Sequence, residues 1–172
     1  RHSLGLALHL AGSLEEAAKH FRLAVELGDF SARTLLGAVL LDLGMASQAK
    51  SHLEQALQNA PDDAEAWYLL GQAHAELSDH HSASAAFSRS LEVRPGHRAT
   101  VLFRAASKWS AGDLTGALSD YECALALQED LATLLNLSSV CRGLGKLERA
   151  EHFARRAIEK SPDASTAWTK LG

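Results

Sequence analysis

The stretch Ala64–His97 reads AEAWYLLGQAHAELSDHHSASAAFSRSLEVRPGH, and its length of 34 residues is the period that runs through the chain. Alanines recur with steps of 32, 34, 34 and 33 residues, at Ala17, Ala49, Ala83, Ala117 and Ala150. A second series keeps the same register, at Gly12, Gly44, Ser78, Gly112 and Gly145. A fixed period of this size predicts a solenoid of stacked units, and a solenoid favours a binding surface over an active site.

Each unit is predicted to form two amphipathic helices joined by a tight turn. In the quoted unit, apolar positions recur at i, i+3, i+4 and i+7, at Leu70, Ala73, His74 and Leu77, which is the pattern of one helix face. This unit gives a first helix over Ala64–Leu77 and a second over His80–Val93, which Pro95 and Gly96 end. The same plan predicts helices over Arg1–Ala11, Ser13–Leu27, Phe30–Leu43, Ala46–Asn59, His97–Ala111, Leu114–Leu127, Leu131–Leu144 and Leu147–Lys160.

The predicted organisation is all-α, with about five repeats and the start of a sixth. We expect one continuous domain over residues 1–172, with repeats at about 1–29, 30–63, 64–97, 98–130, 131–164 and a partial unit at 165–172. Because the chain begins with Arg1 and stops within the repeat pattern, we interpret it as a piece of a longer protein.

Composition narrows the classes of partner. Hydrophobic residues make up 47% and aromatic residues 6% of the chain, which favours helices packed through small side chains. The net charge of −4 comes without a basic stripe, so nucleic acid is not an expected partner. No apolar run reaches the roughly 18 residues of a membrane span, so membrane insertion is not expected. The composition is of a cytoplasmic type, although it does not determine a compartment.

No residue pattern points to catalysis, a cofactor or a metal. The nine histidines include no pair at i, i+4 spacing and no HExxH, and His74 is expected in a core position. Cys123 and Cys141 lack a CxxC pattern and are interpreted as reduced helix thiols. We therefore expect this segment to be no enzyme and to have no catalytic, cofactor or metal site.

The quoted unit resembles the tetratricopeptide repeat, whose pattern is W-x2-L-G-x2-Y, then A-x3-F, then P. Trp67, Leu70 and Gly71 match the first part, Ala83 and Phe87 the second, and the stretch Trp168–Gly172 repeats the opening. The resemblance implies a right-handed α-solenoid. Small residues let the two helices of a unit approach closely, at Gly5, Gly37, Gly71, Ala105, Ser138 and Gly172. The first and fourth units lack the terminal proline, with Asp29 and Glu129-Asp130 near its place, which should alter the local loop and not the fold.

The resemblance also implies that the first helices of successive units line a concave groove. The expected partner-binding residues are Leu35, Tyr68, Leu69, Gln72, Leu102, Phe103, Trp109, Asn136, Ser139 and Arg142. Two known binding modes of the family do not fit. A clamp for acidic tails needs Lys, Arg and Asn, where this chain has Thr34, Ala38, Leu69, Ala99 and Phe103. An asparagine ladder needs Asn in every unit, where this chain has Ser3, Leu35, Leu69, Phe103, Asn136 and Lys170.

An apolar groove predicts capture of an amphipathic helix or an extended apolar segment of a protein partner. Gln72, Asn136 and Arg142 would supply the polar contacts. Several alternatives stay open. Flanking parts of a longer chain could cover the groove, and Phe103 or Trp109 could simply pack between units. The segment could also be the substrate-recruiting arm of a larger enzyme, such as a transferase or a hydroxylase. It could self-associate by pairing Ser165–Gly172 with Arg1–Ala11 of another copy.

Overall fold

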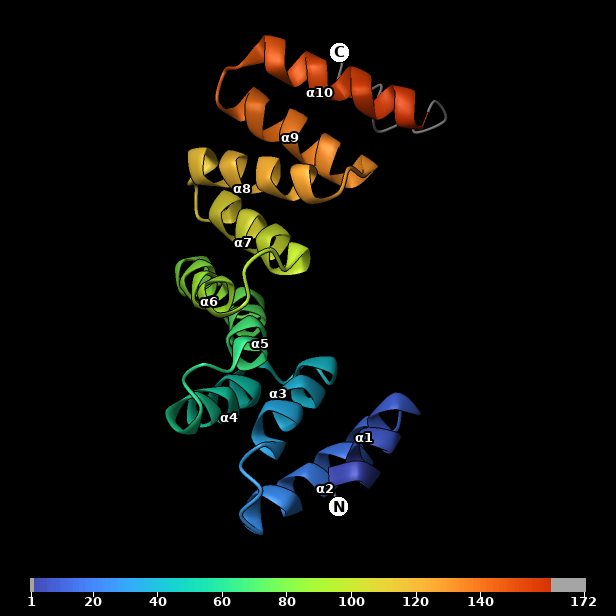
Figure 1. The fold of residues 1–172 in the computed structure, drawn as a ribbon, viewed down its shortest axis with the longest axis vertical. Helices are drawn as coiled ribbons and strands as arrows, with labels where there is room; N and C mark the ends of the chain where they lie inside the picture. The colour runs from blue at the N-terminus through green and yellow to red at the C-terminus, as the bar shows by residue number, and fades with distance from the viewer. Residues whose placement is uncertain (1, 162–172) are drawn as a thin grey trace. The chain divides into compact units, whose positions relative to one another are not determined.

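The computed structural model describes residues 2–161, and every regular element in that range is an α-helix (Figure 1). The ten helices there form five pairs: α1 (His2–Leu10) and α2 (Leu14–Glu26), α3 (Ala32–Asp42) and α4 (Ala46–Asn59), α5 (Ala64–Glu76) and α6 (His80–Val93), α7 (Arg98–Ser110) and α8 (Leu114–Leu127), and α9 (Leu131–Gly143) and α10 (Leu147–Lys160). The prediction of an all-α repeat of helical pairs is confirmed. The partial unit at 165–172 lies outside the described residues.

The chain forms two compact units, Arg1–Pro95 and Gly96–Gly172. In the first, helices that follow one another in sequence pack together from α1 to α6, and α3 also contacts both α1 and α5. In the second, α7 packs on α8, α8 on α9, and α9 on α10. The boundary between the units falls between two whole repeats, and the single continuous domain over 1–172 stays a prediction.

The tight turns inside the repeats explain the second residue series. Gly12, Gly44, Gly112 and Gly145 all have positive φ, between 70° and 85°, and Ser78 takes the same conformation with φ of 61°. In each turn the next residue's N–H reaches back to a carbonyl of the first helix, as from Asp79 to the His74 oxygen at 2.9 Å. This is a helix ending of the Schellman type, which favours glycine at that position because glycine has no Cβ.

Aspartates begin four of the helices. The Asp63 carboxylate accepts hydrogen bonds from the backbone N–H groups of Glu65 and Ala66, at 3.0 and 3.1 Å. Asp79, Asp113 and Asp130 cap α6, α8 and α9 in the same way. Each caps a donor that the helix itself leaves unpaired, which fixes where the helix starts.

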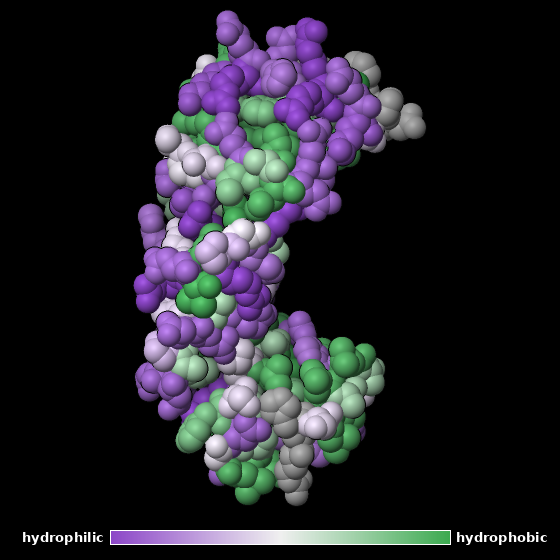
Figure 2. Space-filling model, viewed as in Figure 1, coloured by the Kyte–Doolittle hydropathy of each residue, from purple (hydrophilic) through white to green (hydrophobic). Residues whose placement is uncertain are grey.

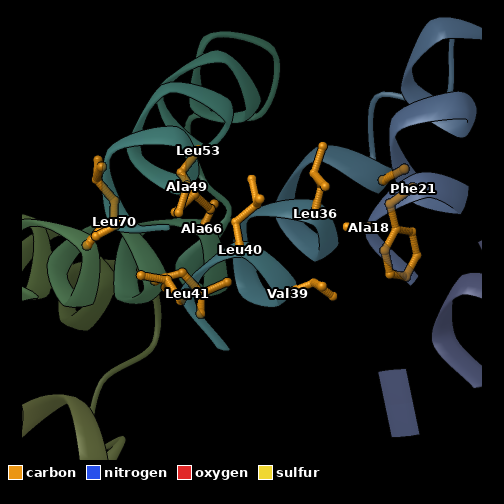
Figure 3. Packing of buried hydrophobic residues seen from close by; sticks show 14 of the residues in the cluster. Ala18, Phe21, Leu36, Val39, Leu40, Leu41, Ala49, Leu53, Ala66 and Leu70 are labelled. Carbon is orange, nitrogen blue, oxygen red and sulfur yellow. The ribbon is translucent and has the colours of Figure 1, made fainter. Parts of the chain in front are cut away.

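The core of the first unit lies between the first and second helices of its repeats (Figure 3). Phe21, Leu36, Leu40 and Leu53 are fully buried there. The alanine series from Ala17 to Ala150 is buried in both units, so those positions are contact points between helices. Leu77 differs from the prediction, because it caps the end of α5 and is 42% exposed.

Gly37 and Gly71 mark the closest approach of paired helices. A Cβ atom added to Gly71 would lie 2.5 Å from Cε1 of Phe87, and one added to Gly37 would lie 2.6 Å from Cδ2 of Leu53. No real Cβ atom fits at such distances, so the large second-helix side chain occupies the space that the glycine leaves. The second unit has its own core around Tyr121, with Leu134, Leu137, Val140 and Phe153.

Candidate functional site

A pocket of about 460 Å³ lies within the second unit and is lined by residues of α7, α8 and α9. Leu102, Phe103 and Ala106 reach it from α7, and Asn136 reaches it from α9. Tyr121 of α8 lines it as well. Three of the predicted groove residues, Leu102, Phe103 and Asn136, are therefore brought together around one hollow.

Helix geometry places these side chains. Leu102, Phe103 and Ala106 are neighbours on one face of α7, because residues one turn apart on a helix point the same way. The Phe103 side chain is 40% exposed, while Leu102 is half-buried against the core of the second unit. The pocket thus combines an accessible aromatic ring with an apolar wall that packing already holds in place.

Tyr121 gives the pocket a rigid aromatic lining. It is buried, and Trp109 meets it edge to face with ring centroids 6.3 Å apart and planes at 87°. Burial raises the pKa of Tyr121 to about 12, so its phenol is neutral at physiological pH. Trp109 is half-buried, packs on the core and does not line the pocket.

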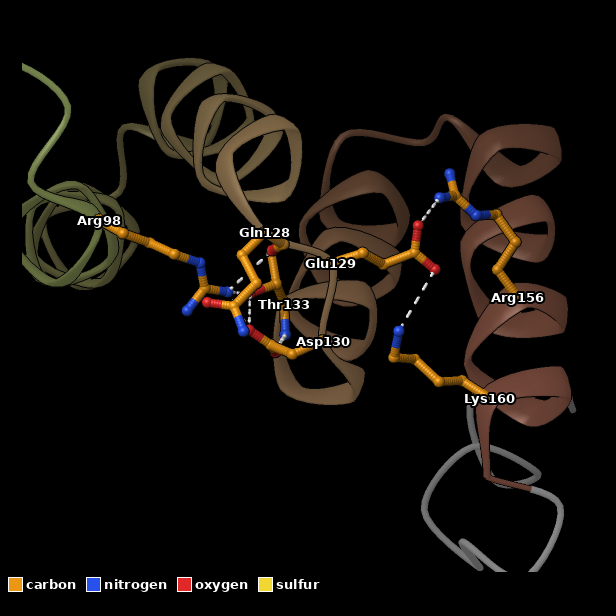
Figure 4. Close-up of polar contacts among 7 residues, drawn as sticks. All are labelled: Arg98, Gln128, Glu129, Asp130, Thr133, Arg156 and Lys160. Atoms are coloured by element: carbon orange, nitrogen blue, oxygen red, sulfur yellow. Dashed lines mark hydrogen bonds and ion pairs between the residues drawn. The ribbon is translucent and has the colours of Figure 1, made fainter.

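One end of the pocket is closed by a polar network around Arg98, which Figure 4 shows. The Arg98 guanidinium pairs with Asp130 and donates to the Gln128 carbonyl at 3.1 Å and to Thr133 Oγ1 at 3.0 Å. Burial of Asp130 opposes its ionisation, but hydrogen bonds from the Thr133 N–H and from Arg98 outweigh burial and hold its pKa below the ordinary value. This network fixes the start of α9, and therefore the position of Asn136 one turn and a half further on.

The loop before α9 also makes ion pairs with α10. Glu129 pairs with Arg156 of α10, and Lys160 Nζ lies 3.9 Å from a Glu129 carboxylate oxygen (Figure 4). These charge pairs stand where the fourth repeat lacks its proline. The predicted change in this loop is thus a set of ion pairs that tie α7, α9 and α10 together.

The predicted polar groove residues of α9 differ in whether they already have partners within the protein. Ser139 Oγ donates to the Leu135 carbonyl at 3.0 Å within the helix. The Asn136 amide has no hydrogen bond to any other described residue, and Arg142 is exposed without a carboxylate partner among residues 2–161. Asn136 and Arg142 are therefore the α9 groups with donors available for a ligand.

The predicted groove residues of the first unit are more covered. Leu69 is only 8% exposed and belongs to the core, while Leu35 and Tyr68 are half-buried against it. Gln72 Nε2 donates to the Tyr68 hydroxyl at 3.1 Å. Burial, and secondarily the Glu65 carboxylate, raises the pKa of Tyr68. In this unit the apolar strip expected to be exposed is largely packed away by its neighbours.

Sequence reasoning missed Tyr121 and Arg98 as parts of the site. Tyr121 occupies a second-helix position that the repeat pattern assigns to packing between helices, so nothing in the pattern marks it as lining a pocket. Arg98 could have been found from the missing proline, since Asp130 near that place leaves a carboxylate that needs a cationic partner.

Other site types find no support in the part of the chain that the structure describes. Residues 2–161 contain no group of three or more His, Cys, Asp or Glu side chains able to hold a metal ion. None of the helices in that range has the length and apolarity of a membrane span. Cys123 is exposed and Cys141 is buried, and both are free thiols.

Tandem helical hairpins in one register define a helical-repeat protein, and comparison with known families specifies which kind. The family model described as tetratricopeptide repeat matches residues 34–98 and 102–165. The chain belongs to the tetratricopeptide repeat family.

Known proteins and solved structures are also similar to this chain. The chain is 26% identical over 151 residues to superkiller complex protein 3 of Mus musculus, covering 79% of this chain but 10% of that protein. It thus spans about a tenth of the length of that curated relative. The structure is similar to that of MamA, with a TM-score of 0.87 and 19% identity over 92% of this chain and 94% of that chain. It is equally similar to YrrB, described as a TPR protein with an unusual peptide-binding site, with a TM-score of 0.87 and 21% identity over 98% and 88% of the two chains.

Proposed function

We propose that this chain is a protein-interaction scaffold whose second unit anchors a partner polypeptide in the pocket between α7 and α9. The observation that carries the proposal is the convergence of Leu102, Phe103 and Asn136 on a hollow of about 460 Å³. This volume lies in the range of pockets that bury a ligand group, and it combines an apolar lining with few polar groups. YrrB, a protein of the same fold, has a peptide-binding site.

The partner group that suits this pocket is an apolar side chain. Phe103 and Leu102 would contact its flanks and Tyr121 its tip, because these are the apolar surfaces that line the hollow. Aromatic anchors of this kind contribute most of the energy in many protein interfaces. An amphipathic helix or an extended apolar segment can supply such a side chain.

Asn136 would fix the partner's backbone. Its amide carries both a donor and an acceptor and has no hydrogen bond to any residue that the structure describes. A peptide bond beside the anchor side chain offers the matching acceptor and donor. Ser139 and Arg142 continue along α9, where Arg142 would add a charged contact.

Within the first unit, the proposed partner contacts are Leu35, Tyr68, Leu69 and Gln72, in a reduced role. Tyr68 and Gln72 are half-buried and already bonded to each other, so they would offer a pre-formed polar edge. Leu69 would act through the core that holds Tyr68 in place. The proposal includes no catalytic role, because the sequence places no nucleophile beside a base in a defined pocket.

The test is affinity selection from a native lysate, followed by binding of a synthetic peptide from the captured partner, measured by fluorescence anisotropy. We expect Phe103→Glu and Asn136→Ala to weaken that peptide roughly tenfold or more, because both remove anchors of the contact. Leu127→Glu is the matched control, since Leu127 is an exposed apolar residue of the same unit that does not line the pocket. Equal loss in the control, or none in the two pocket variants, would refute the proposal.

Self-association is a second candidate, favoured by one observation. Leu4, Leu6 and Leu10 of α1 are exposed, and Figure 2 shows apolar side chains gathered at this end of the first unit. The other end of the predicted pairing, 165–172, lies outside the described residues. Light scattering over a range of concentrations tests this candidate, and a mass that stays monomeric, unchanged by Leu4→Glu/Leu10→Glu, would remove it.

A further inference from the structure

Three basic side chains from three helices form a cluster in the first unit, whereas the pocket described above belongs to the second unit. Arg22 comes from α2, Arg33 from the start of α3, and His52 from α4. Arg22 Nη2 lies 3.4 Å from Gln48 Oε1 of α4, which brings the α2 guanidinium to the fourth helix. Burial lowers the pKa of His52, and the charges of Arg22 and Arg33 lower it further. His52 therefore lies within the field of both guanidinium groups.

The two arginines have no acidic partner in the part of the chain that the structure describes. Elsewhere arginines pair with carboxylates, as Arg94 does with Glu65 and Arg149 with Glu122. Arg22 has one long hydrogen bond to a neutral amide, and Arg33 has a ring contact alone. Neither guanidinium is neutralised by an ion pair within residues 2–161, so an anion bound near them would be electrostatically favoured.

Two buried nitrogen atoms of the cluster lack hydrogen-bond partners. Arg33 Nε and His52 Nδ1 are both shielded from solvent and make no hydrogen bond within residues 2–161. Buried polar atoms in native proteins are normally satisfied, so each such atom calls for an explanation. A ligand that draws the Arg33 fork and the His52 ring toward it would supply the missing acceptor.

The repeat register shows why Arg33 is unusual. Arg33 stands four residues before Gly37, as Trp67 stands four residues before Gly71. In the third repeat Trp67 is satisfied, because its Nε1 donates to the Pro61 carbonyl at 2.8 Å. In the second repeat the same position carries a charged fork with no such acceptor.

An apolar surface adjoins the charges. Phe30 is 54% exposed and Leu27 is 69% exposed, and both lie at the turn from α2 to α3. The Arg33 Cζ atom lies 5.0 Å from the centroid of the Phe30 ring. Arginine and an exposed aromatic ring together are the residue types enriched in protein interfaces.

We propose that Arg22, Arg33 and His52, together with Phe30, form a second binding site that receives an acidic segment of a partner polypeptide. A carboxylate of the segment sits between the two guanidinium groups, whose planar forks match its oxygens. An apolar side chain next to that carboxylate packs on Phe30. This site belongs to the first unit and is independent of the pocket between α7 and α9.

The experiment uses the full chain and a fluorescein-labelled peptide in which glutamates flank a single phenylalanine. Fluorescence anisotropy at pH 7 measures its affinity for the wild type and for Arg22→Gln/Arg33→Gln. We expect a loss of roughly tenfold in the double variant, and a similar loss on raising the salt concentration. Arg155→Gln is the matched control, because Arg155 is an exposed arginine of the second unit that belongs to neither proposed site.

Additional variants separate the effects of charge, side-chain shape and folding. Arg33→Lys keeps the charge but loses the fork and should weaken binding by an intermediate amount, while Leu127→Glu, outside both proposed sites, should leave it unchanged. Circular dichroism checks the fold, and Arg22→Gln alone serves if the double variant unfolds. The proposal is overturned if the wild type does not bind the probe, or if a probe with glutamine in place of each glutamate binds equally. It is also overturned if Arg155→Gln weakens binding as much as the double variant.

Discussion

Arg104 of α7 holds Asp120 of α8 through two parallel hydrogen bonds, from Nε to Oδ2 at 2.9 Å and from Nη2 to Oδ1 at 2.6 Å. Lys108, one turn further along α7, places its Nζ 2.8 Å from the same carboxylate. The Asp120 side chain is only 7% exposed, whereas those of both cations are 22% exposed. In the third repeat, the positions of Arg104 and Lys108 hold Leu70 and His74. The fourth repeat therefore joins its two helices through a charge network where the third uses Leu70 and His74.

Removing the carboxylate of this network should destabilise the protein strongly. We expect Asp120→Ala to lower the free energy of unfolding by about 2–4 kcal/mol, because two partly buried cations lose their shared partner. Urea unfolding at pH 7 measures the change. Glu92→Ala is the control, since it breaks the exposed pair with Arg89 and should cost at most about 0.5 kcal/mol. Equal losses in the free energy of unfolding would show that the Asp120 network stabilises the protein no more than an exposed ion pair.

A methyl group at Gly71 should disrupt the third repeat. Gly71→Ala would place its Cβ against the Phe87 ring, so α5 and α6 must separate or the ring must move. The expected loss of stability is about 1–3 kcal/mol, the usual effect of overpacking. Thermal unfolding followed by circular dichroism checks it. Gly143→Ala is the comparison, because its added Cβ would lie 3.1 Å from a Leu114 methyl group at the end of a flexible side chain, and it should cost less stability than Gly71→Ala. Equal losses from the two substitutions would contradict the crowding argument.

In the series of turns inside the repeats, Ser78 stands where the others have glycine, and a glycine there should stabilise the protein. Ser78 has φ of 61°, a conformation that is unfavourable for residues with a Cβ. We expect Ser78→Gly to stabilise the protein by about 1 kcal/mol, after the extra flexibility of the unfolded chain is allowed for. The reverse change, Gly112→Ser, should destabilise by a similar amount. Both are measured by urea unfolding, and a destabilised Ser78→Gly would mean that the Ser78 side chain has an additional role.

Acid should weaken the loop that begins α9. The pKa of Asp130 in the folded protein lies below its ordinary value of 3.8, so the folded state releases this proton more readily than the unfolded state. The resulting stability is present above that ordinary value and is lost as pH falls through the lower folded value. We expect Asp130→Asn to lose less stability than the wild type between pH 5 and pH 2, measured by urea unfolding. Arg98→Gln should show a similarly reduced dependence, and an unchanged slope in both variants would contradict the assignment.

The sequence by itself determined the repeat. The glycine series encodes turns with positive φ, the alanine series encodes close helix contacts, and the aspartates encode helix starts, all through interactions between residues near in sequence. Such local rules do not depend on distant contacts, so the helices and their pairing followed directly. The register also placed Leu102, Phe103 and Asn136 on first helices, where the pocket is lined.

Only the tertiary structure decided which of those side chains are accessible. Periodicity gives the direction of a side chain from its helix, but exposure depends on the size of neighbours in other helices. Leu69 is covered by the core of the first unit, and Trp109 packs edge to face against Tyr121. The partners of charged groups also come from distant positions, as Arg98 finds Asp130, Arg104 finds Asp120, and Arg22 and Arg33 find no acid among the described residues. Pairing across such separations is set by how the helices stack, and no local pattern records it.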